Sequence, residues 1–307
     1  MRIVCLGDTH YSSMRWRTKE LKEQNHYFYS QIFETFFAQD ADLYVSLGDL
    51  THYGSRREFG SVYRLIHQYK KADQRFEAVV GNHDLLVQTK ASYRQLTGSR
   101  LYWSEDHPEA KLIFMDTCRA LHPGKSSSAI DFDQRTFVKK ELRSAGEKLV
   151  VIFAHHAPER MRFYNEAGDY DPSLTMDQLL AEKKGAGIFI NGHLHRDRYF
   201  TKDQWAFLQF NDVLDEPTIR VLDFKEGQVT MSTVSLDSPE MIHASRMIIR
   251  SLITFRREEN PLEYAQVRRL ALTTPEGIEF PNWNMDYVRT IDRPYISKKK
   301  RNHFRIR

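Results

Sequence analysis

Residues 3–10 read Ile-Val-Cys-Leu-Gly-Asp-Thr-His, and the pattern in this stretch recurs along the chain. Four apolar residues, typical of a buried strand, are followed by a glycine and then by Asp8 and His10. Five more short apolar runs have the same character, and most of them end in Gly, Asp, Asn or His. The six predicted strands cover residues 3–6, 43–47, 77–80, 112–115, 149–154 and 187–190.

Helical patterns lie between several of these strands. Apolar stripes at helical spacing run through residues 27–37, 59–69 and 137–142. The alternation of buried strands with amphipathic helices predicts an α/β fold. After Arg198 the period shortens, and residues 199–210, 218–224 and 228–234 predict a meander of antiparallel strands.

The composition excludes several classes of protein. Of the 307 residues, 41% are hydrophobic and 28% are charged, which is typical of a globular chain and argues against disorder, collagen or a coiled coil. No apolar run approaches the roughly 18 residues that a membrane helix needs, and the first strand is too short for the core of a signal peptide. Cys5 and Cys118 lie in apolar segments and are expected to be buried free thiols. These features predict a cytoplasmic protein that has no membrane partner.

The charge is distributed unevenly. The net charge is +4, yet residues 287–307 hold eight basic residues and one acid, which leaves −3 for the rest of the chain. Residues 241–253 predict an amphipathic helix before this basic end. We therefore expect one domain over residues 1–238 and a C-terminal extension over 239–307. The extension is also a candidate interface for a homo-oligomer.

The residues that follow the predicted strands are of the types that bind transition metals. Ligands of open α/β sheets gather at the carboxyl ends of strands, so these side chains are expected to meet at one rim. The donors are carboxylates, imidazoles and an amide, with no thiolate among them. Two residues that are two positions apart in an extended chain point the same way, as is expected for Asp8 with His10 and for His193 with His195. The candidates are Asp8 and His10, Asp49, Asn82 with His83 and Asp84, His155 with His156, and His193 with His195.

The order of these motifs resembles that of the calcineurin-like metallophosphoesterases over residues 1 to about 210. Gly48-Asp49-Leu50-Thr51-His52 and His155-His156-Ala157-Pro158 are most similar to the bacterial cyclic-nucleotide phosphodiesterase-like branch. The resemblance implies a four-layer αββα sandwich of two mixed β-sheets with a C-terminal helical or irregular extension. It places a pair of metals on loops at one edge.

The resemblance also implies the role of each residue. Two divalent or trivalent ions (Mn, Fe, Zn or Co) would be bound, with Asp49 and a hydroxide between them, and the hydroxide would attack phosphorus in line. His83 is implied as the residue that protonates the leaving alkoxide or stabilises its developing charge, with Asp84 orienting its ring. Asn82 is a candidate for contact with substrate, and so is His52, because it lies near these motifs in the sequence. One ion is assigned to Asp8, His10, Asp49 and His195, and the other to Asp49, Asn82, His155 and His193.

The implied activity is hydrolysis of phosphoester bonds. A phosphodiesterase that acts on a small molecule such as a cyclic nucleotide is favoured. A broad phosphomonoesterase and a nuclease of the same superfamily stay open, since the basic end can bind phosphates. Nucleic acid is the less favoured substrate, because no DNA-capping domain follows residue 210. A non-catalytic scaffold is disfavoured because every ligand is present. The purple acid phosphatase branch is also disfavoured, because His52 stands where those enzymes have a metal-binding tyrosine.

Overall fold

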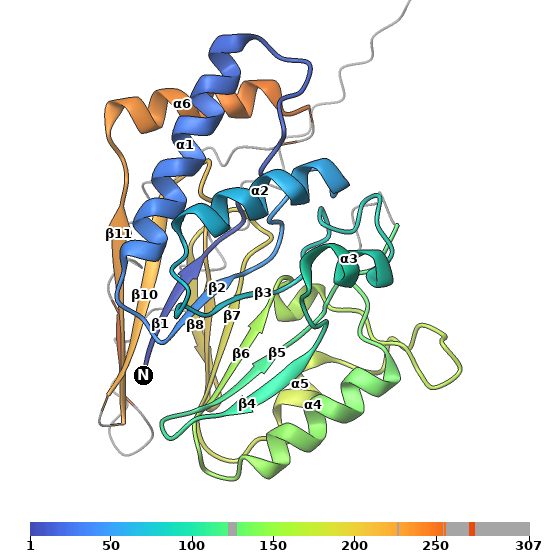
Figure 1. Cartoon of the computed structure of the whole chain (residues 1–307). Helices are drawn as coiled ribbons and strands as arrows, with labels where there is room; N and C mark the ends of the chain where they lie inside the picture. Colours follow the sequence, from blue (N-terminus) through green and yellow to red (C-terminus); the bar gives the residue numbers. More distant parts are fainter. Residues whose placement is uncertain (122–127, 226, 254, 256–269, 274–307) are drawn as a thin grey trace, which may run out of the picture.

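The computed structural model describes residues 1–121, 128–225, 227–253, 255 and 270–273. Two six-stranded mixed sheets pack face to face, and helices cover both outer faces (Figure 1). The buried residues between the sheets are almost all aliphatic or aromatic and come from strands of both sheets, for example Val45, Val151 and Leu222. The expected four-layer αββα sandwich is therefore confirmed.

The first sheet has the order β12-β11-β10-β1-β2-β3. Its strands β1, β2 and β3 are parallel, and the other neighbouring strands pair antiparallel. The three parallel strands end at the same edge, which is the edge that carries the first polar motifs. The bounds are β1 Arg2–Leu6, β2 Leu43–Ser46, β3 Phe76–Ala78, β10 Thr218–Lys225, β11 Gln228–Ser235 and β12 Leu270–Thr273.

The second sheet has the order β4-β5-β6-β7-β9-β8 and a parallel centre. The predicted meander is wrong, because the hairpin β8–β9 belongs to this sheet and the hairpin β10–β11 belongs to the first. Turn signals locate hairpins, but they do not tell to which sheet each hairpin adds. The bounds are β4 Trp103–Asp106, β5 Lys111–Phe114, β6 Val150–Ala154, β7 Gly187–Asn191, β8 Arg198–Lys202 and β9 Trp205–Gln209.

Each outer face is covered by its own helices. Helices α1 (Lys19–Ala38), α2 (Arg56–Tyr69) and α6 (Pro239–Ser251) share a core with the first sheet. Helices α4 (Phe132–Ser144) and α5 (Met176–Leu180) share one with the second sheet. Helix α3 (Lys90–Thr97) packs beside α2, and a short 3₁₀ helix spans Pro158–Arg160.

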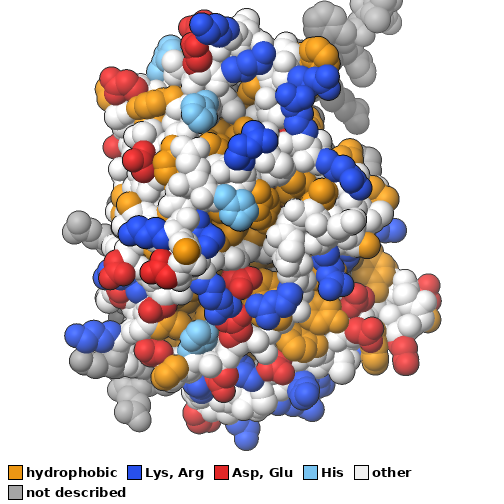
Figure 2. Space-filling model, viewed as in Figure 1, with side chains coloured by type: hydrophobic (Ala, Val, Ile, Leu, Met, Phe, Trp, Pro, Cys, Tyr) orange, Lys and Arg blue, Asp and Glu red, His pale blue; other side chains and the backbone are white. Residues whose placement is uncertain are grey.

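The helix expected at residues 241–253 is α6. It packs against α1 of the same chain and buries Met241, Ala244 and Ile248. The division into residues 1–238 and 239–307 stays a prediction, and the basic segment 287–307 lies outside the described residues. On the face seen in Figure 2, Lys and Arg side chains are interspersed with Asp and Glu, in keeping with the small net charge of the rest of the chain.

The structure also bears on the expectations for the two cysteines and for membrane-spanning helices. Cys5 and Cys118 are both free and buried, as expected. Within the described parts of the chain, every helix is too short or too polar to cross a bilayer.

Candidate metal centre

The predicted ligand side chains meet at one rim of the sandwich. They occupy the loops after β1, β2 and β3 of the first sheet and after β6 and β7 of the second. The loops converge because parallel strands end at the same edge of each sheet. Three groups of potential ligands form there: Asp8 with His10 and His195, Asp49 with His155 and His193, and His10 with His52 and His83.

The first group consists of one carboxylate and two imidazoles. The Nε2 atoms of His10 and His195 lie 2.8 Å apart. Asp8 Oδ2 lies 3.4 Å from His195 Nε2 and 3.9 Å from His10 Nε2. All three side chains thus direct donor atoms at the same small volume.

The second group, which contains Asp49, lies beside it. His155 Nε2 is 3.3 Å from Asp49 Oδ2, 3.0 Å from Asn82 Oδ1 and 3.2 Å from His193 Nδ1. Asp49 Oδ2 is also 3.8 Å from His10 Nε2, so this oxygen lies between the two groups. The Nδ1 of His155 donates to Leu47 O at 2.9 Å, which fixes the tautomer and leaves Nε2 as the ligand atom.

The backbone at four of these residues is strained. His10, Asp49, His193 and His195 have φ values of 45°, 46°, 73° and 51°, in the left-handed region that non-glycine residues rarely adopt. Hydrogen bonds hold this conformation, since His10 N donates to Asp49 O at 2.8 Å and His193 N donates to Asp8 Oδ2 at 3.0 Å. Such strain concentrates at functional sites, where the surrounding structure enforces it.

Glycines allow the loops to approach one another closely. A Cβ added at Gly192 would lie 2.1 Å from Asp8 Oδ1, and one at Gly81 would lie 2.2 Å from Asp49 Oδ1. Neither distance leaves room for a methyl group. The glycines that precede these motifs are therefore required by the packing of the two carboxylates.

The carboxylates favour positive charge at this rim. Burial alone would lower the pKa of His155, but Asp49 and Asp8 outweigh it and raise the pKa to about 9. Asp212 and Asp8 overcome burial in the same way and raise the pKa of His195 to about 10. By contrast, burial and the neighbouring His155 lower the pKa of His193 to about 3. Either a proton on an imidazole or a bound cation can supply the charge that the carboxylates favour.

The donor set fits a pair of transition-metal ions. Seven side chains contribute imidazole nitrogens, carboxylate oxygens and one amide oxygen, and none of the seven is a thiolate. Such mixed N/O donors suit Mn, Fe, Zn or Co. The carboxylate of Asp49 lies between the two groups, where a shared ligand is needed.

The contacts of His83 and Asp84 differ from the expected ones. The ring of His83 donates from Nδ1 to His52 O at 2.7 Å, and Asp84 is not its partner. The Asp84 carboxylate instead accepts from Leu50 N, Thr51 N and Gly81 N at 3.2, 2.9 and 3.0 Å. Asp84 therefore ties the loop after β3 to the loop after β2. A catalytic role for Asp84 stays a prediction that these contacts do not favour.

Two further histidines, His52 and His156, are buried beside the metal centre. His52 Nδ1 lies 3.3 Å from His10 Nδ1, and burial lowers the pKa of His52 to about 3. The His52 side chain is fully buried, so its predicted contact with substrate is not favoured by the structure. His156 Nδ1 is 2.8 Å from the hydroxyl of Thr117, and its ring lies 4.2 Å from that of His193.

Sequence reasoning missed two residues that contact a predicted ligand. Asp212 Oδ2 lies 3.8 Å from His195 Nδ1, the typical place for a carboxylate that orients a metal-binding histidine. Phe255, in the C-terminal extension, stacks on the His195 ring at 5.0 Å between centroids. Asp212 follows the end of β9, so the rule that found the other motifs could have found it. Phe255 lies in a segment without any motif.

A buried ion pair connects the loop that carries His193 and His195 to the first sheet. Asp197 pairs with Arg220 of β10, and both side chains are 3% exposed. Asp197 also accepts from Asn211 N at 2.9 Å. The segment that carries His193 and His195 is thereby attached to the first sheet as well as to the second.

Comparisons with known proteins agree with this geometry. Residues 1–197 match the profile of the calcineurin-like phosphoesterase family. A protein of Arcobacter nitrofigilis named "Probable glycerophosphodiester phosphodiesterase GpdQ" is 26% identical over 127 residues, which cover 39% of this chain and 43% of the relative. The matched part is thus less than half the length of that relative.

Solved structures show a likeness of fold. A dimetal phosphatase from Danio rerio superimposes with a TM-score of 0.57 at 12% identity, over 76% of this chain and 96% of that one. The purple acid phosphatase PPD1 from yellow lupin gives a TM-score of 0.50 at 12% identity, over 76% and 51% of the two chains. The matched profile, the order of the motifs and their convergence at one rim lead to one conclusion: the chain belongs to the calcineurin-like phosphoesterase family.

Proposed function

We propose that the protein hydrolyses phosphodiester bonds of a small molecule and depends on two metal ions. The observation that carries this proposal is the position of Asp49 between two groups of donors, 3.3 Å from His155 Nε2 and 3.8 Å from His10 Nε2. A single structural metal would need one group of about four ligands. Two adjacent groups that share a carboxylate suit a pair of ions that acts on a phosphate.

Each group has its own ligands in this proposal. Asp49 would contribute to both ions, and its position between His10 and His155 supports this role. When bound, the metal pair supplies Lewis acidity towards the phosphate oxygens and lowers the pKa of water. The first ion would be held by Asp8, His10 and His195, and the second by Asn82, His155 and His193, with Asp49 shared.

His83 is the residue that we assign to proton transfer. Its Nδ1 donates to a carbonyl oxygen, which can only accept, so the neutral ring carries its proton on Nδ1 and leaves Nε2 unprotonated. In the imidazolium form, Nε2 carries the proton that a leaving alkoxide needs. The ring lies 4.6 Å from that of His10, so it borders the centre. Its backbone N–H donates to Asp49 Oδ1 at 2.7 Å, which couples its position to the shared carboxylate.

The choice of a diester rests on the relative whose name is that of a phosphodiesterase. Cyclic nucleotides and glycerophosphodiesters are both small diesters that fall within this proposal. Manganese or iron are the metals that we expect, and the two buried free thiols support a place in the cytoplasm.

The test is a panel of rates with and without metal. After removal of metal by a chelator, Mn²⁺ should restore turnover of bis-p-nitrophenyl phosphate, with slower turnover of p-nitrophenyl phosphate and of single-stranded DNA. His155→Ala should abolish the restored rate, whereas His26→Ala, at an exposed histidine of α1, should leave it unchanged. A faster rate on the monoester or on DNA would overturn the assignment as a small-molecule phosphodiesterase.

A further inference from the structure

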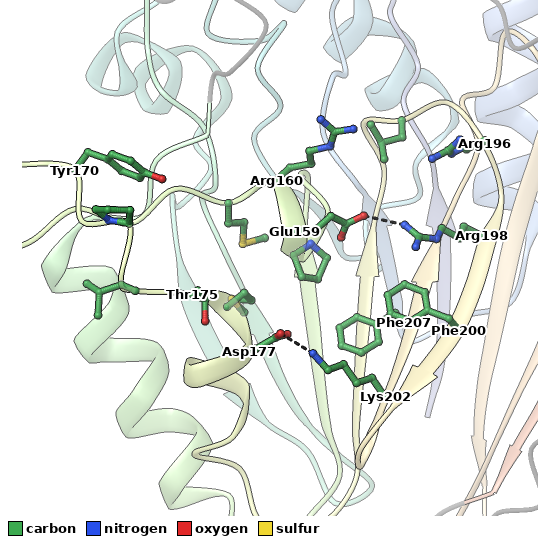
Figure 3. A pocket seen from close by; sticks show the side chains of 16 residues that line it. Glu159, Arg160, Tyr170, Thr175, Asp177, Arg196, Arg198, Phe200, Lys202 and Phe207 are labelled. Carbon is green, nitrogen blue, oxygen red and sulfur yellow. Dashed lines mark hydrogen bonds and ion pairs between the residues drawn. The ribbon is translucent and has the colours of Figure 1, made fainter. Parts of the chain in front are cut away.

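A second feature, a large pocket, lies beside the candidate metal centre. It has a volume of about 830 Å³ and is lined by residues of the loop after β6, the segment 170–175 and the start of α5, the loop after β7, and strands β8 and β9 (Figure 3). This volume is in the range of pockets that bind organic ligands, and it far exceeds the volume of a single ion. We call it the Arg198 pocket; the residues that matter below are Glu159, Arg160, Asp177, Arg196, Arg198, Phe200, Lys202 and Phe207.

The pocket and the metal centre share a wall. His193 and His195 direct their rings at the metal centre, whereas Leu194 and Arg196 line the pocket. On the loop after β6, His155 belongs to the centre and Pro158, three residues later, lines the pocket. The loops that carry His155, His193 and His195 therefore contribute residues to the metal centre and to the pocket alike.

Positive charge is in excess in the pocket. Four cationic side chains line it, against the two carboxylates of Glu159 and Asp177. Arg198 donates to Glu159 at 2.8 Å and Lys202 to Asp177 at 2.5 Å, as the dashed lines in Figure 3 show. The side chains of Arg160 and Arg196, like that of Arg198, lie in the upper part of Figure 3, away from Lys202 and Asp177. Guanidinium groups match the oxygens of a phosphate, which they can bind in bidentate fashion.

The pocket also has an apolar surface. The rings of Phe200 and Phe207 stack at 4.5 Å with an angle of 7° between their planes. The guanidinium carbon of Arg198 lies 4.6 Å from the centre of the Phe200 ring. The pocket thus offers an aromatic surface next to cations, which suits an organic group that bears a phosphate.

We propose that the Arg198 pocket binds the second arm of the substrate, and that this arm carries a phosphate of its own. The substrate class is then a phosphodiester in which one of the two alcohols bears a further phosphate. This inference rests on the proposed phosphodiesterase function, because it places the scissile diester at the metal centre. The Arg198 pocket then sets the preference among diesters.

Two matched substrates test the proposal. They are the p-nitrophenyl ester of thymidine 5′-phosphate and the same ester with an additional 3′-phosphate. The wild-type protein should show a kcat/KM about tenfold higher for the second, the effect of one charge-assisted hydrogen bond. Arg198→Gln and Arg160→Gln should each lower the ratio of the two kcat/KM values towards one. Lys184→Gln, which removes an exposed cation outside the pocket, should retain it.

Binding provides a second readout that does not depend on turnover. By calorimetry, thymidine 3′,5′-bisphosphate should bind the wild-type protein about tenfold more tightly than thymidine 5′-phosphate, and Arg198→Gln should remove the difference. A wild-type protein without preference, or a preference that both variants retain, overturns the role of the pocket. If no phosphoester is turned over, the proposed function fails, and the binding ratio alone decides the role of the pocket.

Discussion

The candidate metal centre and the Arg198 pocket lie on either side of one loop, yet they are constructed in opposite ways. At the centre, Asp8 and Asp49 have side-chain exposures of 1% and 2%, and four ligands have strained backbone. In the pocket, the side chains of Lys202 and Asp177 are 50% and 61% exposed, although they form an ion pair. The polar side chains of the metal centre are buried and fixed in position, whereas the ion pair of Lys202 with Asp177 in the pocket is exposed and weak.

The difference follows from what each region has to do. Metal ligands must keep their geometry in the absence of substrate, so their positions are set by packing and by hydrogen bonds behind them. Charges that bind a ligand arm have to exchange their partners when the ligand arrives, and exposed ion pairs of low energy allow this exchange. Substitutions at the metal centre are therefore expected to change stability and metal binding strongly. Substitutions in the pocket are expected to change stability only slightly.

The largest effect is expected at Gly192. In Gly192→Ala the new methyl group would lie 2.1 Å from Asp8 Oδ1, so the carboxylate has to move. We expect a loss of about 3 kcal/mol in the free energy of unfolding, the upper part of the usual range for overpacking, together with loss of metal. Denaturant unfolding and metal analysis provide the measurement.

Gly60→Ala is the matched control. A Cβ at Gly60, on the exposed side of α2, has no neighbour within 4 Å. This variant should gain about 0.5–1 kcal/mol, because alanine is favoured over glycine in a helix. Equal stability and metal content in the two variants would show that the centre is not packed as described.

His83→Gln is expected to lose about 10²–10⁴ in kcat for a substrate with an alkyl leaving group. The loss should be much smaller for p-nitrophenolate, which leaves without a proton. Metal content should stay that of the wild-type protein, because His83 is not among the assigned ligands. Equal losses for the two leaving groups would exclude the general acid role.

A smaller effect is expected at Asp212, whose carboxylate faces His195 Nδ1 at 3.8 Å. Asp212→Asn keeps the shape of the side chain and removes its charge, so the affinity for metal should fall about 10–100-fold. Titration of the chelator-treated protein with Mn²⁺ measures this affinity. Asp203→Asn, in the exposed turn between β8 and β9, is the control that should bind metal as the wild-type protein does.

The smallest effect is expected in the pocket. Asp177→Asn breaks the ion pair with Lys202 at the exposed end of the pocket. The free energy of unfolding should change by less than about 1 kcal/mol, as is usual for exposed pairs. A loss as large as that of Gly192→Ala would show that the pocket is as tightly constrained as the centre.

The sequence predicts the centre well because its signals are local. Each ligand follows an apolar run, and parallel strands bring the ends of such runs to the same edge. The buried thiols and α6 are predicted for similar reasons, from patterns within single segments. The local patterns predict an α/β fold, whereas the four-layer sandwich is predicted from the resemblance to the family. All seven assigned ligands lie at the rim, although their role as ligands stays a prediction.

Features that depend on contacts between distant segments could not be predicted. The two hairpins after residue 197 add to different sheets, which no turn signal indicates. Asp84 was expected to orient His83, but its carboxylate is directed at backbone groups of the loop after β2, a choice that only the folded arrangement determines. Phe255, four residues after the end of α6, stacks on the ring of His195, and nothing in the local sequence marks this contact.

The metal content of the purified protein tests the central claim most directly. Mass spectrometry of the elements should find two equivalents of transition metal per chain in the wild-type protein at saturation. Asp49→Asn keeps the size of the shared side chain and should retain at most one equivalent at the same free metal concentration. A single equivalent in the wild-type protein, or two equivalents bound with unchanged affinity in Asp49→Asn, would contradict a dinuclear centre joined by Asp49.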